Sequence, residues 1–236
     1  LGRSNNFFLQ FSKKIFCYSN EIINFPKKYF NKIILIEPLL RKEFYDISSK
    51  KNNEINSDIK ILIIGGSQGA MFFDKNLKNS IRDISKKYSL KVYHQVNHSE
   101  MKHLKSFYEN NNIENQLFNF EDDIFKYIVE ANIAITRAGA STLSELAFLK
   151  VPFIAIPYRF ATDNHQLENA LYYKENGCCW LLKEEEFDQN KLTTLLINII
   201  ENSEDYLNKK KSLEKFYYQN NWNNINKKLI NFLNEN

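Results

Sequence analysis

Two short glycine-containing segments, each directly after a run of apolar residues, constrain the fold of this chain more than any other feature of its sequence. Residues 65–70 (GGSQGA) follow the run at residues 60–64, and residues 137–140 (RAGA) follow a second run at residues 133–136. A helical pattern begins after each glycine segment. An apolar strand that passes through a glycine turn into a helix is the repeating unit of parallel sheets covered by helices.

The alternation of strand and helix continues along most of the chain. The expected strands are residues 60–64, 91–96, 116–120, 133–136, 153–156 and 178–182, and the expected helices are residues 74–88, 100–110, 122–131, 141–149, 166–176 and 188–202. Six alternations with short connections predict an α/β fold with a doubly wound parallel sheet. In such sheets ligands bind at the carboxyl ends of the strands, near the point where the strand order reverses. We therefore expect the functional residues in the turns that follow the strands.

The composition is that of an ordinary globular protein. Of the 236 residues, 43% are hydrophobic and 25% are charged, which excludes a disordered or collagen-like chain. The 32 basic and 28 acidic residues give a net charge of +4, too small by itself to indicate a nucleic-acid partner. Three cysteines (Cys17, Cys178 and Cys179) exclude a disulfide scaffold and show no metal-ligand spacing. We expect reduced thiols in a cytosol-like compartment.

The sequence shows no membrane span, since about eighteen apolar residues are needed and the longest candidate, residues 151–158, contains two prolines. No signal peptide is recognisable, and a first residue of Leu1 rather than Met suggests a fragment. Residues 48–58 are polar, which predicts a linker at residues 51–58 between two domains. Before it, apolar residues at roughly helical spacing between Phe7 and Phe16 are followed by a strand-like run at residues 33–36.

The first glycine segment suits an anion. Glycines let backbone N–H groups approach a phosphate closely, the following helix offers its positive end, and Ser67 adds a hydroxyl donor. The segment is neither a Walker loop nor a complete dinucleotide-binding fingerprint. A tight turn that needs glycine only for its backbone shape explains the same residues, so both interpretations stay open.

The second segment, residues 137–145 (RAGASTLSE), offers the same choice. Ser141 can cap the helix with Glu145 in its first turn, and a capping box needs no ligand. In the functional interpretation, the amides of Ala140, Ser141 and Thr142 hold a phosphate while Glu145 accepts hydrogen bonds from two vicinal hydroxyls, as a ribose diol requires.

The third segment, residues 157–170 (PYRFATDNHQLENA), gathers side chains that hydrogen-bond sugar hydroxyls well. An ordinary polar surface loop is the alternative. His165 lacks a neighbouring nucleophile with a third partner, which disfavours a catalytic triad.

Taken in order, the motifs GGSQGA, FEDD, RAGASTLSE and PYRFATDNHQLENA resemble the MurG family of bacterial peptidoglycan N-acetylglucosaminyltransferases. The resemblance spans residues 59 to about 182, and it implies a GT-B fold and an inverting transfer of GlcNAc from UDP-GlcNAc to lipid I, giving lipid II. It further implies a peripheral enzyme on the cytoplasmic face of the bacterial inner membrane, with roles in cell-wall synthesis, cell shape and cell division. The implied partners are UDP-GlcNAc, lipid I and the membrane surface, with no nucleic acid.

The part before the linker resembles the family more loosely. Residues 1–5 (LGRSN) look like a segment near the end of the family's N-terminal domain, and residues 37–41 (EPLLR) stand where the family has G-N-P-x-R. The glycine-rich G-G-T-G-G-H loop, which carries the proposed catalytic histidine, is absent, and so is a donor-site asparagine. The resemblance thus implies a remnant of the acceptor domain at residues 1–50, a donor domain at 59–205 and C-terminal helices at 206–236 that return towards the first domain.

The resemblance also assigns roles to residues of this chain. Ser67 and Arg41 would contact the donor diphosphate, Glu121 would hold uracil through its backbone, and Glu145 would bind the ribose hydroxyls. The remaining implied donor contacts are Ala140, Ser141, Thr142, Leu143 and Ser144 at the diphosphate and ribose, and His165, Gln166 and Asn169 at the sugar.

The implied mechanism needs no metal and no cofactor. No D-x-D motif is evident, and Asp122 and Asp123 are expected to cap a helix. Helix starts near Gly69 and Ser141, together with Arg41, would offset the charge that develops on the departing diphosphate. The catalytic base is unknown and is expected in the missing N-terminal region.

Two other function classes fit parts of the sequence. A non-catalytic donor-binding subunit of a two-chain GlcNAc-transferase is the main alternative, although such a subunit would be expected to start near Ile59. A nucleotide-dependent oxidoreductase is disfavoured, because the fingerprint is incomplete and no acidic residue follows the next strand, at residues 96–98 (VNH).

Overall fold

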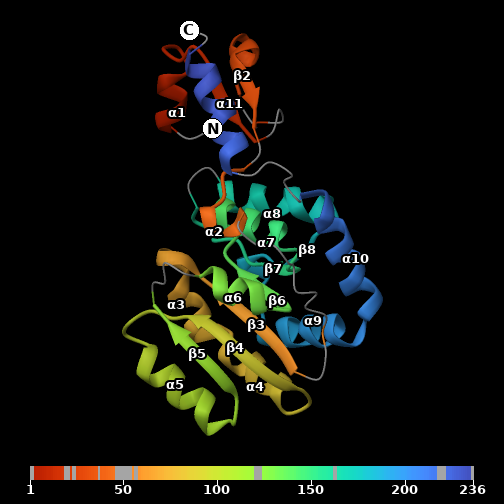
Figure 1. Ribbon diagram of the computed structural model, residues 1–236. Coiled ribbons are helices and arrows are strands. Elements are labelled where there is room, and N and C mark those ends of the chain that lie inside the picture. Colours follow the sequence, from red (N-terminus) through yellow and green to blue (C-terminus); the bar gives the residue numbers. More distant parts are fainter. Residues whose placement is uncertain are drawn as a thin grey trace.

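The computed structural model describes residues 3–18, 22, 25–36, 38–45, 55, 58–119, 124–161, 164–216 and 222–234. Figure 1 shows a larger unit built around a parallel sheet and a smaller unit at one end that contains both ends of the chain. The connection expected at residues 51–58 lies outside the described residues except for Ile55 and Asp58, and the predicted domain limits stay a prediction.

The larger unit is organised by one six-stranded sheet. Its strands are β3 (Asp58–Ile64), β4 (Ser89–Gln95), β5 (Glu114–Phe118), β6 (Ile133–Thr136), β7 (Phe153–Ala155) and β8 (Cys179–Leu181). They pair in the order β5-β4-β3-β6-β7-β8, and every pair is parallel. The order reverses between β3 and β6, so the predicted doubly wound α/β sheet is confirmed.

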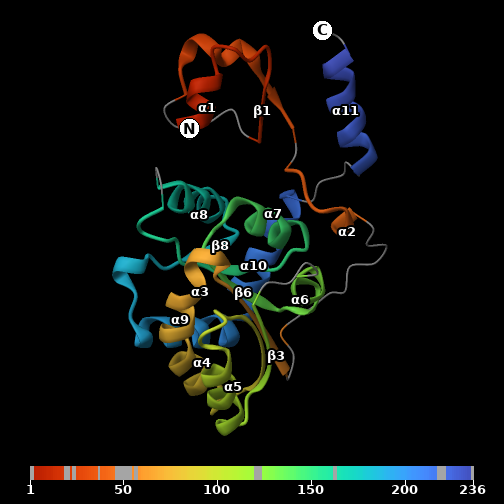
Figure 2. The same ribbon diagram turned by 90° about the vertical axis from the view of Figure 1, so that its left-hand side faces the viewer.

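Helices cover both faces of this sheet (Figure 2). One face carries α3 (Gly66–Asn76), α4 (Lys78–Ser85), α5 (Met101–Asn110) and α9 (Gln189–Glu201), and the other carries α2 (Lys42–Tyr45), α6 (Phe125–Glu130), α7 (Ala140–Phe148) and α8 (His165–Glu175). Along β3, Ile61 and Ile63 pack on the first face while Leu62 and Ile64 pack on the second. This alternation is the two-residue period of a strand that is buried on both sides.

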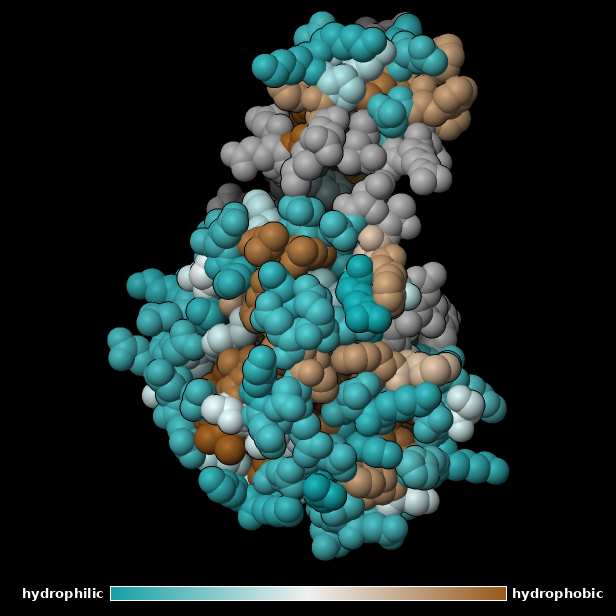
Figure 3. Space-filling view, turned by 180° about the vertical axis from the view of Figure 1, so that it is seen from behind, coloured by the Kyte–Doolittle hydropathy of each residue, from teal (hydrophilic) through white to brown (hydrophobic). Residues whose placement is uncertain are grey.

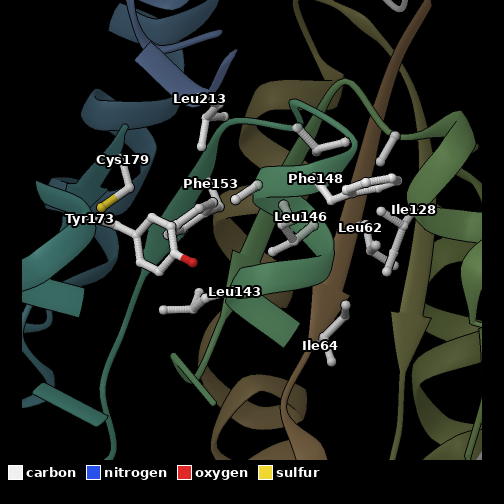
Figure 4. Packing of buried hydrophobic residues seen from close by; sticks show 14 of the residues in the cluster. Leu62, Ile64, Ile128, Leu143, Leu146, Phe148, Phe153, Tyr173, Cys179 and Leu213 are labelled. Carbon is white, nitrogen blue, oxygen red and sulfur yellow. The ribbon is translucent and has the colours of Figure 1, made fainter. Parts of the chain in front are cut away.

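The outer surface of the larger unit is mostly hydrophilic in the view of Figure 3, with small hydrophobic areas between polar side chains. The apolar side chains gather inside instead. Figure 4 shows the core around α7, where Leu143 and Leu146 point towards the sheet and Phe148 lies near Ile128. Helix α10 (Ser203–Leu213) closes this core through Leu213, and a short 3-10 turn, η4 (Glu214–Phe216), follows it.

The smaller unit consists of α1 (Arg3–Phe8), β1 (Ile15–Cys17), the 3-10 turn η1 (Lys27–Lys32), β2 (Ile33–Leu35) and the C-terminal helix α11 (Trp222–Asn234). β1 and β2 form a two-stranded parallel sheet, and Phe232 of α11 contacts Phe16 of β1 with ring centroids 5.8 Å apart. The helical spacing expected through Phe16 was wrong, since the helix ends at Phe8 and Ile15 begins a strand.

Two boundaries in the larger unit differ from expectation. The helix expected at residues 74–88 is two helices, α3 and α4, which meet at Leu77. Helix α3 begins at Gly66 rather than near Gly69, so the glycine segment forms its first turn. Within the described residues, no helix is long and apolar enough to cross a membrane.

Candidate functional site

The two glycine segments lie side by side at the carboxyl ends of neighbouring strands. Ile64 is the last residue of β3 and pairs in register with Thr136, the last residue of β6. The next amide along the chain, that of Arg137, donates to the carbonyl oxygen of Ile64 at 3.4 Å. The strand order reverses between β3 and β6, so both segments stand at the switch point, where doubly wound sheets bind ligands.

The first segment turns into α3 through Gly66, whose φ of +65° is a conformation that glycine adopts without strain. The Gly66 amide donates to Oε1 of Gln95, at the end of β4, at 2.8 Å. The N-terminal end of α3, which includes Ser67, therefore opens at the carboxyl end of β3 and favours an anion there. The described structure leaves out the side chain of Ser67, so its hydroxyl contact stays a prediction.

The second segment is not a serine-capped helix. Gly139 occupies the cap position of α7 and supplies no side-chain hydrogen bond, while Ser141 is exposed in the first turn. Capping by Ser141, one of the two interpretations left open for this segment, was therefore wrong, and the helix begins at Ala140. Ala138, just before the cap, is buried with a φ of +60°, which is unusual for a residue with a side chain.

Of the next residues of this segment, some are exposed to solvent and some are buried in the core. Ala140 is exposed and Thr142 is half-buried, whereas Leu143 is fully buried in the core and Ser144 is buried. Ser144 donates its hydroxyl to the carbonyl oxygen of Ala140 at 2.9 Å. Leu143 could therefore reach a ligand only through its backbone.

Glu145 and Arg41, which are 104 positions apart in sequence, form a direct ion pair. Arg41 Nε lies 2.9 Å from Glu145 Oε1, and the glutamate side chain is only 9% exposed. Burial raises the pKa of Glu145, the Arg41 guanidinium acts to lower it, and Glu43 acts to raise it. The guanidinium also lies 5.3 Å from the ring centroid of Phe44, a core residue of α2.

The third segment is tied to the second by Asn169 of α8, whose Nδ2 donates to the carbonyl oxygen of Ala138 at 3.1 Å. Gln166 accepts a hydrogen bond from the Tyr158 amide at 2.8 Å through Oε1. These partners fix both amide groups, because an N–H must face an oxygen. Among the described residues, no hydrogen bond uses the Gln166 NH₂ group or the Asn169 Oδ1 atom, a donor and an acceptor respectively. His165 is exposed in the first turn of α8.

The structure thus pairs Arg41 with Glu145 of α7, the helix that follows β6, and ties Asn169 of α8 to Ala138 in the turn after β6. Gln166 lies three residues before Asn169, on the same side of α8. Glu121, with Asp122 and Asp123, and also Thr162 and Asp163, fall outside the described residues. Among the side chains that the structure describes, no three potential metal ligands (His, Cys, Asp or Glu) cluster together. The expectation that no metal and no cofactor is required stays a prediction.

Sequence reasoning missed two residues that shape this region. Gln95 accepts from the Gly66 amide, and Arg137 is buried under the turn with a 2.6 Å ion pair to Glu184. Gln95 lies near the end of one expected strand and Arg137 directly follows another, and that position was the signal available for them. Their partners are 29 and 47 residues away in sequence, so only the fold reveals the contacts.

Comparisons with known proteins agree with this architecture. The family described as "Glycosyltransferase family 28 C-terminal domain" matches residues 60–222. A Pelagibacter ubique (strain HTCC1062) protein is 51% identical over 236 residues, with 100% of this chain and 66% of the relative covered. A Rickettsia bellii (strain RML369-C) protein is 32% identical over 220 residues, with 91% and 62% covered. Both are named UDP-N-acetylglucosamine–N-acetylmuramyl-(pentapeptide) pyrophosphoryl-undecaprenol N-acetylglucosamine transferase.

Solved structures show the same fold. The crystal structure of Acinetobacter baumannii MurG matches with a TM-score of 0.75 at 21% identity, with 100% of this chain and 64% of that chain covered. A glycosyltransferase from Rickettsia africae ESF-5 matches with a TM-score of 0.59 at 14% identity, with 100% and 67% covered. The family model and the curated relatives confirm the resemblance that the four motifs indicated. The chain spans just under two thirds of the length of the curated relatives it matches.

Proposed function

This chain belongs to glycosyltransferase family 28, and from that premise we propose that it is the donor-binding part of an inverting N-acetylglucosaminyltransferase. The reaction would move GlcNAc from UDP-GlcNAc to lipid I, the undecaprenyl-linked muramoylpentapeptide, in peptidoglycan synthesis. The name of the Pelagibacter ubique relative, which is 51% identical to this chain, describes this transfer. The observation that carries the proposal is a pair of contacts on the segment that follows β6, beside the switch point of the sheet. They are the Arg41–Glu145 ion pair on α7 and the hydrogen bond from Asn169 to the Ala138 carbonyl.

Each contact suits one part of a sugar nucleotide. The N-terminal ends of α3 and α7 favour the diphosphate, and Arg41 adds a positive charge beside them. Ionised Glu145 would accept hydrogen bonds from the two ribose hydroxyls, which a buried acceptor recognises strongly. The Gln166 NH₂ group would donate to a sugar oxygen, and Asn169 Oδ1 would accept from a sugar hydroxyl.

The chemistry divides between this chain and the rest of the protein. An acceptor hydroxyl attacks the anomeric carbon as UDP leaves, so the step needs a base for the hydroxyl and stabilisation of the diphosphate charge. The helix ends and Arg41 would supply the second of these. We place the base in the acceptor domain, and with it the contact to the cytoplasmic face of the membrane that a lipid-linked substrate requires. The enzyme's roles in cell shape and division would follow from this reaction.

Calorimetry of the chain with UDP-GlcNAc tests the proposal. We expect measurable binding of UDP-GlcNAc and weaker binding of ADP, because the uracil and sugar contacts are specific. We expect no appreciable turnover by residues 1–236 alone, because we place the base in the acceptor domain. A folded chain that gives no heat with UDP-GlcNAc, or that binds ADP equally well, would contradict the proposal.

Replacing Glu145 separates recognition from helix structure. Glu145→Ala should weaken UDP binding by about 1–3 kcal/mol, the usual effect of leaving buried hydrogen-bonding groups without a partner. Glu130→Ala is the matched control, since Glu130 also pairs with a cation, Lys60 at 3.0 Å, but its half-exposed side chain lies away from the turn. Unchanged UDP affinity in Glu145→Ala would leave Glu145 as the partner of Arg41 alone.

A further inference from the structure

Arg137 is a buried cation that the proposed donor contacts do not use. It follows β6 directly and is 4% exposed. Its Nη1 atom lies 2.6 Å from Oε2 of Glu184, in the 3-10 turn η3 (Glu184–Glu186), and donates to the carbonyl oxygen of Ile156 at 3.3 Å. Its Nε atom has no hydrogen-bond partner among the described residues.

The guanidinium is enclosed by aromatic rings from two other elements. Its Cζ atom lies 4.4 Å and 5.0 Å from the ring centroids of Phe72 and Phe73 of α3, and 5.5 Å from that of Tyr158. A planar cation at these distances is attracted to ring faces, and a lysine ammonium cannot stack in the same way. Arg137 therefore joins α3, which begins at the diphosphate turn, to residues 156–161, which lead to α8.

Arg137 contacts residues 156–161 at two points, and its partner Glu184 contacts them at a third. Nη1 bonds the Ile156 carbonyl oxygen, the guanidinium stacks near the Tyr158 ring, and Glu184 Oε2 accepts from the Arg159 amide at 3.4 Å. The Tyr158 amide in turn donates to Gln166 Oε1. Arg137 therefore acts on the Gln166 amide through Tyr158, which contacts both residues. Arg137 itself is buried.

Such burial has an energetic cost. Desolvation lowers the pKa of Arg137, and the ion pair with Glu184 acts in the opposite direction. A buried ion pair often contributes little to stability compared with apolar side chains of the same size, and a single fixed geometry is its best-attested use. A positioning role accounts for this arginine better than stability does.

We propose that Arg137 is a positioning residue that sets the Tyr158–Gln166 contact and so tunes recognition of the GlcNAc part of the donor. The inference rests on the proposed function, because it takes Gln166 as a sugar contact. It makes a prediction that a stability role does not. Loss of Arg137 should weaken the sugar-dependent part of binding and leave the affinity for UDP nearly unchanged.

The experiment compares affinities for UDP-GlcNAc and UDP, by calorimetry, in the chain and its variants. Arg137→Lys keeps the charge but loses the planar guanidinium, and Glu184→Gln removes the negative charge that pairs with that guanidinium. Each should lower UDP-GlcNAc affinity about tenfold, as expected for a lost hydrogen bond to a charged group, with UDP affinity within about twofold. Arg82→Lys is the control, because Arg82 is a partly exposed arginine paired with Asp83 on α4 and should leave both affinities unchanged.

Hydrogen exchange supplies a second readout, in which the amides of residues 156–161 should lose protection in Arg137→Lys but not in Arg82→Lys. Equal loss of both affinities, or no loss, would overturn the inference while leaving the proposed function intact. If neither Arg137→Lys nor Glu184→Gln folds, Arg137 is a stability residue and the inference is wrong. If the unmodified chain binds neither ligand, the proposed function fails and the inference fails with it.

Discussion

Gly139 is a glycine that the fold of this chain does not itself require. Its φ of −63° is open to any residue, and a Cβ atom built there would meet nothing nearer than Thr142 Oγ1, at 3.9 Å. It stands at the cap of α7, where we place the diphosphate. A close approach by a phosphate oxygen is therefore the requirement that a side chain would violate.

We predict that Gly139→Ala leaves the free energy of unfolding within about 0.5–1 kcal/mol, or raises it, because alanine restricts the unfolded chain. The same change should weaken UDP binding about tenfold or more, since the added methyl group occupies space that the diphosphate needs. Urea unfolding and calorimetry measure the two effects separately.

Gly177 is the matched control for this change. Its φ is +72°, and a Cβ there would lie 3.2 Å from Ser212 Oγ. Gly177→Ala should therefore lower the free energy of unfolding by at least about 1 kcal/mol while leaving UDP affinity unchanged. If Gly139→Ala behaves like Gly177→Ala, the turn after β6 is a structural turn only.

At the scale of single residues, the sequence identified candidate site residues but not the contacts that they make. Glu145 stood out in its motif, but its ion pair with Arg41 joins positions that no local pattern connects. Capping of α7 by Ser141 was one of the two interpretations of this segment, because serine is a good cap, yet Gly139 takes that position. Local sequence preferences could not predict that the helix start moves from Ser141 to Ala140. That start depends on Ala138, which adopts a left-handed conformation inside the core.

Among the elements, α3 and β4 are joined by a buried polar cluster of Asp74, His94 and Tyr108. His94 Nδ1 lies 3.0 Å from the Tyr108 hydroxyl, and His94 Nε2 lies 3.5 Å from Asp74 Oδ1. Asp74 Oδ2 accepts from the Asn97 amide at 3.0 Å. Burial raises the pKa of Asp74 to about 6, and burial lowers the pKa of His94 to about 3.

These two pKa shifts act on stability in opposite directions. Asp74 has a folded pKa above the unfolded value of about 3.9, so its contribution to stability increases as the pH falls from about 6 towards 4. His94 has a folded pKa below the unfolded value of about 6.5, so its contribution decreases as the pH falls below 6.5. The two effects should largely cancel between pH 6 and 4.

Substitutions should uncouple the pair. Asp74→Asn removes the first effect, so its free energy of unfolding should fall relative to the unmodified chain by up to about 1.4 kcal/mol per pH unit below pH 6. His94→Gln should show the reverse, a relative gain over the same range. Urea unfolding at several pH values from 7 to 4.5 measures both. Parallel pH profiles for all three proteins would contradict the assignment.

Elements were predictable wherever one period dominated the sequence. All six strands of the sheet were expected within about two residues at each end. The apolar runs of β3, β6 and β7 are buried on both faces, whereas the edge strand β5 is mostly polar. Helix α3 was expected to start too late, because its first turn carries glycines that suggest a loop, and α3 and α4 were merged because the apolar spacing continues through Leu77. The strand β1 was missed because its three residues are too few to show a period.

At the scale of the whole molecule, the segment before the sheet belongs to both units. Residues up to β2 lie in the smaller unit, whereas Leu40 and Phe44 are buried in the core of the larger one. The Phe44 ring centroid lies 4.9 Å from that of Phe125. Arg41, which stands between Leu40 and Phe44 in the sequence, forms the ion pair with Glu145. The smaller unit, by contrast, has a sheet of only two three-residue strands, with Phe7, Phe8 and Phe11 exposed on and just after α1. Such a sheet is too small for independent stability.

Two truncations test this division. A protein of residues 38–216 keeps Leu40, Arg41 and Phe44, and it should unfold at nearly the same urea concentration as the full chain and bind UDP with similar affinity. A protein of residues 46–216 loses all three and should be less stable by at least about 3–5 kcal/mol, the usual effect of emptying one large aromatic site, with weaker UDP binding because Glu145 has lost Arg41. Phe44→Ala should reproduce the stability loss in the full chain, while Phe30→Ala, at a half-exposed ring in the smaller unit, should not. Equal stability of the two truncated proteins would show that residues 38–45 merely rest on the donor-binding unit and that its core is complete without them.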